Sequence, residues 1–242
     1  LIVNLDGTKN IIDSLNKYSN KKVWFFYSST SHVYSYGYRI KNESKHSIPL
    51  NYYGKTKKLA ENYIIKNQKK IIPCIGRIFS YTHYNQDKNF LVPSLIDKLK
   101  NKKKDIYFKN LNHYRDFITI YDIYTAIKKL MSKKTKGIYN ISSGQKLNLK
   151  DILLTLNRKY KKNIYFNDNK IKTVLFGSNN KLKKIGWKPS YKNYLKYIFK
   201  IYLKLMKNNI LFFSIDRLGD YLIRSNVIKK ISENYDDVEI IG

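Results

Sequence analysis

The feature that most constrains the fold is a pair of short, mainly apolar runs that alternate with amphipathic segments. The runs cover residues 23–27 and 71–79. Apolar residues at helical spacing fill residues 1–18 before the first run and residues 53–68 between the two. Strands that are apolar throughout are typical of parallel sheets covered by helices on both faces. The alternation predicts an α/β fold built on a doubly wound (Rossmann) parallel sheet.

Beyond Phe79 the predicted elements become shorter, which indicates a smaller α+β part. We expect helices at residues 90–99, 122–132, 149–160 and 191–207, and strands at residues 106–108, 117–120 and 137–141. The apolar run 210–215 then begins a new strand, which a turn, a helix (221–234) and another strand (238–241) follow. We therefore predict one domain over residues 1–208 and the βαβ start of a second unit over residues 209–242.

The formal charge of +31 raises the question of an anionic partner. The basic residues are overwhelmingly lysines spread along the whole chain, whereas base readout and phosphate clamping favour arginine. We therefore expect no specific nucleic-acid partner. Two alternatives stay open: a basic module that binds nucleic acid or anionic membranes, and peripheral membrane association through the basic helix 191–207.

Other bulk properties narrow the class of protein. Apolar residues make up 43% of the chain, which is enough for a core, and no apolar run is long and charge-free enough to span a bilayer. The first residues lack the pattern of a signal peptide, so we expect a cytoplasmic protein. The single cysteine, Cys74, excludes an internal disulfide and a multi-thiolate site, and we expect no metal.

The strongest chemical signal is the segment Tyr53-Gly-Lys-Thr-Lys57 at a predicted helix start. Residues four apart share one face of a helix. A tyrosine that exchanges protons near neutral pH needs its pKa lowered from about 10, and a lysine ammonium one turn away stabilises the phenolate. Reaching a pKa near 7 corresponds to roughly 4 kcal/mol of differential stabilisation. Because the chain is rich in both residue types, the pair alone is better explained as two surface side chains.

A second segment accompanies the pair. Tyr27-Ser-Ser-Thr-Ser-His-Val-Tyr34 stands at the end of the first apolar run, and ligands of doubly wound sheets bind beyond the carboxyl ends of strands. Here the chain resembles the extended short-chain dehydrogenase/reductase family, the NAD-dependent epimerases and dehydratases. In that family a strand ends in Ser-Ser/Thr-x-x-Val-Tyr, and a Tyr-Gly-x-x-Lys helix follows roughly two dozen residues later.

The resemblance implies a site and a cofactor. The family's catalytic residues correspond to Thr30, Tyr53 and Lys57 of this chain. Thr30 would hydrogen-bond the reacting oxygen, and Tyr53 would exchange the proton of a sugar hydroxyl. Lys57 would lower the pKa of Tyr53 and hold the cofactor ribose. The cofactor would be NAD or NADP, bound by Asn4, Ser28, Tyr53 and Lys57, with hydride passing to or from the nicotinamide. For Ser28, ordinary loop and packing chemistry explains the residue as well.

Five further segments extend the resemblance over residues 1 to about 200. Ser80 stands where the family usually has a substrate-binding Asn, and Arg115 is implied as a contact of the substrate diphosphate. The segments are Asn4-x-x-Gly7-Thr-x-Asn10, Arg77-Ile-Phe79-Ser80, Arg115-Asp-Phe-Ile-Thr-Ile-Tyr-Asp122, Gly137-Ile-Tyr-Asn-Ile141 and Leu182-x-x-x-Gly186-Trp-x-Pro189.

Two departures from the family pattern matter. The Gly-x-x-Gly-x-x-Gly loop that cradles the cofactor pyrophosphate is absent, so we expect the first strands of the sheet to precede Leu1 and the printed chain alone to be inactive. Dehydratases of the family have Asp-Glu after the catalytic Thr, where this chain has Ser31 and His32. Eliminating water needs that pair, so dehydratase activity is disfavoured. His32 is able to act as an acid, but a lone loop histidine is more often solvated.

The tail has a resemblance of its own. Asn209-Ile-Leu-Phe-Phe-Ser-Ile-Asp-Arg-Leu-Gly-Asp220 is similar to the start of the heptosyltransferase-type glycosyltransferases. This implies Asp220 as a candidate general base; the alternative is an appended βαβ unit in which Asp220 caps a helix. Both families serve surface-polysaccharide synthesis.

The resemblances together imply a nucleotide-sugar epimerase or 4-ketoreductase, which acts on a nucleotide sugar and forms a homodimer when complete. One rival is a bifunctional polysaccharide protein with a C-terminal glycosyltransferase. The other is the basic nucleic-acid- or membrane-binding module.

Overall fold

The structure is a computed structural model that describes residues 2–43, 47–83, 85–168 and 171–203. The predicted domain boundary after residue 208, the predicted elements of the tail and Asp220 all lie outside these residues.

The main sheet is parallel and has the strand order β1-β2-β7. Strand β1 (Val23–Thr30) pairs with β2 (Ile71–Ile78) along its whole length, and β2 pairs with β7 (Gly137–Ile141). The two strands predicted from the apolar runs are confirmed. Strand β1 continues three residues beyond its apolar run, so Ser28, Ser29 and Thr30 belong to the sheet.

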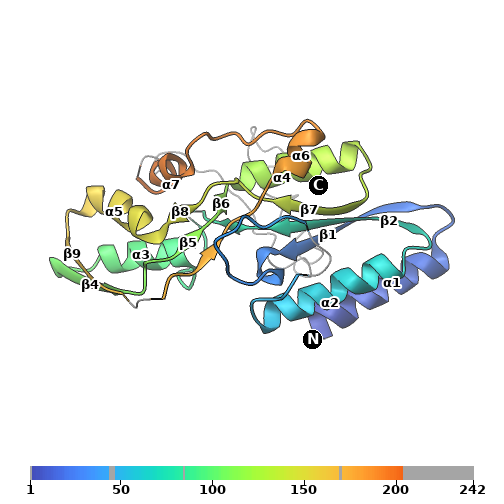
Figure 1. Ribbon diagram of the computed structural model, residues 1–242, viewed down its shortest axis with the longest axis horizontal. Helices are drawn as coiled ribbons and strands as arrows, with labels where there is room; N and C mark the ends of the chain where they lie inside the picture. The colour runs from blue at the N-terminus through green and yellow to red at the C-terminus, as the bar shows by residue number, and fades with distance from the viewer. Residues whose placement is uncertain (1, 44–46, 84, 169–170, 204–242) are drawn as a thin grey trace, which may run out of the picture. The chain divides into compact units, whose positions relative to one another are not determined.

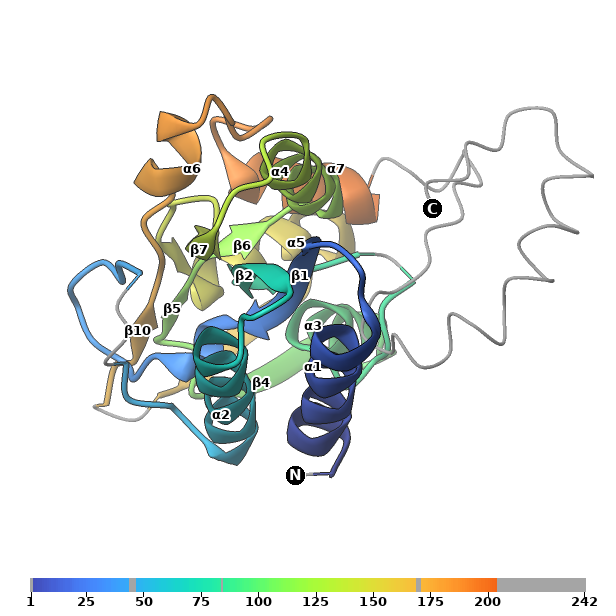
Figure 2. The ribbon, with the colours of Figure 1, turned by 90° about the vertical axis from the view of Figure 1, so that its right-hand side faces the viewer.

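Helices cover both faces of this sheet (Figure 1, Figure 2). A short π-helix, η1 (Ile2–Asp6), leads into α1 (Gly7–Tyr18), which lies beside α2 (Tyr52–Lys66) on one face. Helices α4 (Ile120–Ser132) and α6 (Asn180–Lys184) lie on the opposite face.

The core follows the alternation of side chains along the strands. One set packs under α1 and α2, and the other joins the larger core that includes α4. The first set contains Tyr27, Ile75 and Ile138, and the second contains Cys74, Tyr139 and Ile141. Apolar burial on both faces explains the apolar runs within the strands. The α/β fold with a parallel sheet is therefore present.

The predicted place of strand β7 in the fold is wrong. Residues 137–141 were predicted to belong to the smaller α+β part, but β7 is the third strand of the main sheet. Ile138 packs on the α1–α2 side and Tyr139 on the other, which is how a strand buried between two helical layers behaves. A five-residue strand gives no periodic pattern that would tell it apart from the short strands around it.

The smaller part contains α3 (Leu91–Leu99), α5 (Leu149–Tyr160) and α7 (Tyr194–Leu203) with several short strands. Helix α7 begins three residues later than predicted. Strand β4 (Asp105–Lys109) pairs in parallel with β9 (Asn163–Asn167), which was not predicted. The remaining strands have two residues each: β3 (Ser80–Tyr81) with β6 (Phe117–Ile118), and β5 (Tyr114–Arg115) between β10 (Val174–Leu175) and β8 (Leu147–Asn148). Of these, only β6 was predicted, as residues 117–120; it ends at Ile118 because α4 begins at Ile120.

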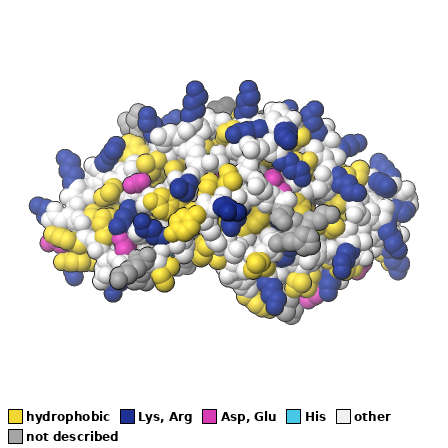
Figure 3. Space-filling model, viewed as in Figure 1, with side chains coloured by type: hydrophobic (Ala, Val, Ile, Leu, Met, Phe, Trp, Pro, Cys, Tyr) yellow, Lys and Arg dark blue, Asp and Glu magenta, His cyan; other side chains and the backbone are white. Residues whose placement is uncertain are grey.

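The surface is basic without a single basic patch on the face shown. Lysine and arginine side chains are distributed over that face with apolar side chains between them (Figure 3). Over the described part of the chain, no helix is long and apolar enough to cross a membrane.

Candidate functional site

The site begins at a close contact between α2 and η2, a 3-10 turn (Ser31–Val33) that follows β1. A Cβ atom on Gly54 would lie 2.0 Å from the carbonyl oxygen of His32, so only glycine lets the helix start here. Asn51 caps the helix, since its Oδ1 accepts from the Gly54 amide at 2.9 Å. The Leu50 amide donates to the same His32 carbonyl at 2.7 Å. Tyr53 is thereby held beside the end of β1.

The structure brings Tyr53 and Lys57 to the carboxyl end of β1. Tyr53 is 45% exposed, and its ring meets the His32 ring edge-on at a centroid distance of 5.9 Å. The Nζ atom of Lys57 donates to the Ser28 carbonyl at 3.0 Å and lies 5.0 Å from the centre of the Tyr27 ring. The ammonium is therefore fixed to the strand one helical turn from the phenol.

Thr30 is the last residue of β1 and is 9% exposed. Its Oγ1 accepts from the His32 amide at 3.2 Å and so caps η2. Ser28 lies two residues earlier and contributes its carbonyl to Lys57. Thr30, Ser28, Tyr53 and Lys57 thus come from two elements that meet at one edge of the sheet, where doubly wound sheets bind their ligands.

His32 is part of this cluster and is not the solvated loop residue that the sequence favoured. Because Asn51 Oδ1 is used by the Gly54 amide, its Nδ2 is the atom that donates to His32 Nδ1, at 3.2 Å. An accepting Nδ1 leaves the ring proton on Nε2. Burial, and then the charge of Arg115, lower the pKa of His32, which keeps the ring neutral near pH 7.

The two predicted substrate contacts lie in the smaller part. Arg115 in β5 donates through Nη2 to the Tyr36 hydroxyl at 3.0 Å and to Thr173 Oγ1 at 2.9 Å, and its guanidinium lies 4.6 Å from the centre of the Tyr36 ring. Burial lowers the pKa of Arg115, and its charge acts on His32. Ser80 lies in β3, partly buried, opposite Phe117 of β6.

Asn4 lies in η1, and its side chain points to α2. Its Nδ2 donates to Thr56 Oγ1 at 3.3 Å, and the Thr56 hydroxyl donates to the Tyr53 carbonyl at 2.8 Å. The Asn4 side chain, which the resemblance implies as a cofactor contact, therefore also links η1 through hydrogen bonds to the first turn of α2, where Tyr53 lies.

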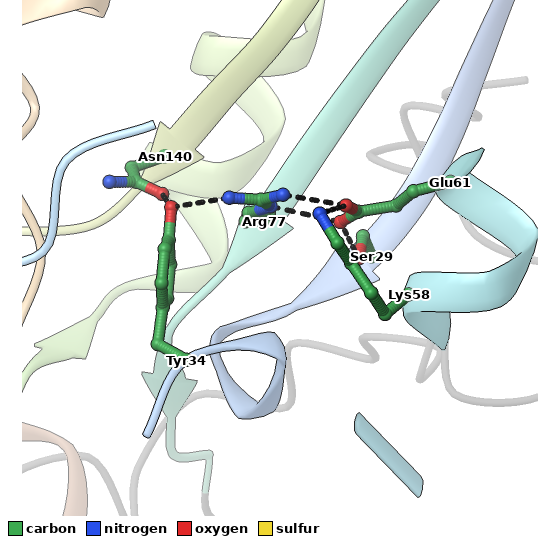
Figure 4. A network of polar contacts seen from close by, with 6 residues as sticks. All are labelled: Ser29, Tyr34, Lys58, Glu61, Arg77 and Asn140. Carbon is green, nitrogen blue, oxygen red and sulfur yellow. Dashed lines mark hydrogen bonds and ion pairs between the residues drawn. The ribbon is translucent and has the colours of Figure 1, made fainter. Parts of the chain in front are cut away.

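A buried polar network beside the site was missed from the sequence. It joins Ser29, Tyr34, Lys58, Glu61, Arg77 and Asn140 (Figure 4). Arg77 stands in the segment Arg77-Ile-Phe79-Ser80, for which no buried partner was predicted. An arginine inside an apolar strand was a usable signal, because a buried charge requires a partner of opposite charge.

The donor groups at the β1 edge fit the nicotinamide-ribose half of a dinucleotide. A phenol and an ammonium one helical turn apart offer hydrogen bonds to ribose hydroxyls.

Two surface hollows, of about 390 and 280 Å³, lie elsewhere: the larger beside Gly144 and Tyr191, the smaller beside Tyr34 and Lys41. Among the described residues, no three His, Cys, Asp or Glu side chains gather to hold a metal ion.

Comparison with known proteins extends over most of the chain. A model of the sequence family described as GDP-mannose 4,6 dehydratase matches residues 1–192. A GDP-6-deoxy-D-talose 4-dehydrogenase of Aggregatibacter actinomycetemcomitans is 30% identical over 142 residues, which cover 57% of this chain and 48% of that protein. A putative UDP-glucose 4-epimerase of Methanocaldococcus jannaschii is 25% identical over 218 residues, which cover 86% of this chain and 70% of that protein. The chain spans about half the length of the first of these relatives.

Solved structures show the same fold. The Pseudomonas aeruginosa protein RMD, complexed with NADPH, matches with a TM-score of 0.70 and 22% identity over 82% of this chain and 71% of that one. The UDP-glucuronic acid 4-epimerase of Bacillus cereus, in complex with UDP-glucuronic acid and NAD, matches with a TM-score of 0.70 and 22% identity over 82% of this chain and 65% of that one.

Proposed function

Because the chain belongs to the GDP-mannose 4,6-dehydratase family of NAD-dependent epimerases and dehydratases, we propose that it carries the catalytic residues of a nucleotide-sugar 4-epimerase or 4-ketoreductase. The observation that carries the proposal is the contact at Gly54. It holds Tyr53 and Lys57 of α2 against the carboxyl end of β1, where Thr30 ends the strand.

In this proposal each residue has a separate task. A bound nicotinamide supplies the acceptor and donor of hydride. Tyr53 exchanges a proton with the C4 oxygen of the sugar, and Thr30 hydrogen-bonds the same oxygen. Lys57 favours the phenolate of Tyr53 through its positive charge and holds ribose hydroxyls. The Ser28 carbonyl and the Tyr27 ring, which hold Lys57 in place, make its position independent of the substrate.

The residues after Thr30 favour epimerisation or ketone reduction over loss of water. Elimination requires an acid and a base on the sugar ring, and Ser31 is buried at 4% exposure. His32 is neutral, and its Nδ1 accepts from Asn51, so it offers a hydrogen-bond donor and no base. The 4-dehydrogenase and 4-epimerase names of the relatives agree with this choice, whereas the matching family model is described as a dehydratase, so the choice rests on Ser31 and His32.

The proposed cofactor is NAD or NADP, and the proposed substrate is a nucleotide sugar, as in the complexes of the structural relatives. Arg115 is the proposed contact of the substrate diphosphate. Its Nη1 donates to the carbonyls of Tyr114 and Thr173, and its Nη2 donates to the hydroxyls of Tyr36 and Thr173. The positive charge of this oriented, partly buried guanidinium attracts a phosphate oxygen, which would replace one of the two hydroxyls at Nη2.

The test is turnover of a panel of UDP- and GDP-sugars, together with their 4-keto derivatives, by the intact protein with NAD(H) or NADP(H). An epimerase yields the C4 epimer without net consumption of cofactor, whereas a ketoreductase consumes reduced cofactor in proportion to the product formed. Formation of a 4-keto-6-deoxy sugar from a hexose, or no turnover with any member of the panel, contradicts the proposal.

A further inference from the structure

The polar network in Figure 4 is centred on a buried ion pair between helix α2 and strand β2. Arg77 and Glu61 are both 0% exposed. Arg77 Nη2 lies 2.6 Å from Glu61 Oε2, and Arg77 Nε donates to Glu61 Oε1 at 2.9 Å. The two parallel contacts fix the relative orientation of the two side chains, which a single contact would leave free to rotate.

The Glu61 carboxylate also binds β1 and its own helix. Ser29 Oγ donates to Oε1 at 2.6 Å, and Lys58 Nζ donates to Oε2 at 3.3 Å. Each carboxylate oxygen therefore accepts two bonds, and the carboxylate joins α2 to both β1 and β2. Burial lowers the pKa of Lys58, and the charge of Glu61 opposes that effect.

The other side of the network holds the connection between β1 and α2. Arg77 Nη1 donates to the Tyr34 hydroxyl at 2.8 Å, and that hydroxyl donates to Asn140 Oδ1 at 2.7 Å. Asn140 Nδ2 in turn donates to the Lys41 carbonyl at 2.8 Å. These bonds fix Tyr34 and Lys41, which lie between β1 and α2, to β7.

The network is adjacent to the proposed site in sequence and in space. Glu61 is one helical turn beyond Lys57, and Ser29 lies between Ser28 and Thr30. The bonds from Lys57 to Ser28 and from Ser29 to Glu61 are thus consecutive links between α2 and the end of β1. A shift of α2 along the strand would stretch both links.

A buried ion pair contributes little net stability compared with apolar residues of the same volume, because both charges lose their hydration. Apolar contacts, however, are not directional, whereas the hydrogen bonds of Glu61 are. We infer that Glu61 is a positioning residue, whose bonds to Ser29 and Arg77 set the place of α2 on the sheet and so the approach of Tyr53 to Thr30. The inference rests on the proposed function for the role of Tyr53.

The first test follows the position of Tyr53 without any reaction. The intact protein carries 3-fluorotyrosine at position 53 only, and its fluorine resonance is compared with that of Glu61→Gln. Gln keeps the size of the side chain but replaces one acceptor oxygen by an NH₂ group, which faces Arg77 together with either Ser29 or Lys58. We expect the resonance to shift or broaden. Ser29→Ala, which removes one bond of the network and retains the ion pair, should give a smaller change in the same direction.

Asp122→Asn is the matched control. Asp122 is also a fully buried carboxylate, bonded to the Ser190 amide and the Tyr194 hydroxyl, but it lies in α4 on the opposite face of the sheet. We expect it to lower the thermal midpoint without moving the fluorine resonance. If Glu61→Gln and Ser29→Ala lower the midpoint as Asp122→Asn does and leave the resonance in place, Glu61 has a structural role only.

The second test is kinetic. Well below the thermal midpoint, Glu61→Gln should lower kcat at least tenfold and leave KM within about twofold, because Tyr53 and not the binding surface has moved. Equal kcat values for Glu61→Gln, Ser29→Ala and wild type would overturn the inference. If the wild-type protein turns over no nucleotide sugar, the proposed function has failed, and the fluorine resonances alone decide the inference.

Discussion

Among single side chains, Tyr53 carries the largest expected effect. Tyr53→Phe removes the phenol oxygen and keeps the ring that packs against His32. Loss of a proton-transfer group typically costs roughly 10²–10⁴-fold in rate, so kcat should fall by that order while cofactor affinity, measured by calorimetry, stays within a few-fold. The neighbouring Tyr52, which is 63% exposed, provides the matched control, since Tyr52→Phe should leave kcat unchanged. Activity of Tyr53→Phe within a few-fold of wild type would rule the mechanism out.

Thr30→Ala should have a smaller effect than Tyr53→Phe. It removes a hydroxyl that orients the sugar oxygen and caps η2 through the His32 amide, but no proton transfer depends on it. We expect a loss of about tenfold in kcat, in line with the net value of one hydrogen bond. Thr30→Ser keeps the hydroxyl and should retain most of the activity. A loss as large as that of Tyr53→Phe would show that Thr30 takes part in proton transfer.

His32 allows a prediction about pH. Its folded-state pKa is lowered from 6.5, first by burial and then by Arg115. The unfolded chain therefore binds a proton before the folded protein does as the pH falls, so the free energy of unfolding decreases below about pH 6.5. His83 and His113 are shifted in the same direction, so the contribution of His32 is the difference between wild type and His32→Gln. Nitrogen NMR should find the neutral ring protonated on Nε2; a proton on Nδ1 would contradict the contact with Asn51.

At the scale of elements, the start of α2 depends on Gly54. A Cβ atom there would overlap the His32 carbonyl, and a backbone atom cannot move away as a side chain can. Gly54→Ala should therefore lower both the thermal midpoint and kcat, although alanine is favoured by about 1 kcal/mol inside an unobstructed helix. The control is Gly37→Ala, whose Cβ would meet only the end of the flexible Lys41 side chain, at 3.0 Å. Comparable stability of the two variants would mean that the helix does not press against η2.

The sequence predicted the elements that have a strong pattern and missed those defined by pairing. Strands β1 and β2 were recognised because both of their faces are apolar. Two-residue strands such as β5 exist only through their partners, and no local pattern marks them. In the site, helical spacing places Tyr53 and Lys57 on one face of a helix, but their proposed roles, like that of Thr30, come from the resemblance to the family. Glu61 was missed because a glutamate in a helix looks like a solvated side chain until its partner in the sheet is known.

For the whole molecule, we propose that residues 1–208 fold independently of residues 209–242. The proposal predicts that a chain ending at residue 208 keeps the thermal midpoint of the 242-residue chain and reproduces its amide NMR spectrum for residues 2–203. Domains that share few contacts fold separately, and linkers between them tolerate cleavage. Loss of cooperative unfolding on truncation would show that the tail completes the core of the first domain.

The central claim is that Tyr53 serves redox chemistry at C4 of a nucleotide sugar without loss of water. It is tested most directly by mass spectrometry of the sugar after turnover of substrates that carry deuterium at C4. With the intact protein, we predict an epimer of unchanged mass that retains the deuterium. In the ketoreductase direction, we predict that a 4-keto sugar is converted to a 4-hydroxy sugar that carries at C4 the deuterium of labelled reduced cofactor; Tyr53→Phe should give neither product. A product lighter by one water, or an undiminished yield with Tyr53→Phe, would contradict the claim.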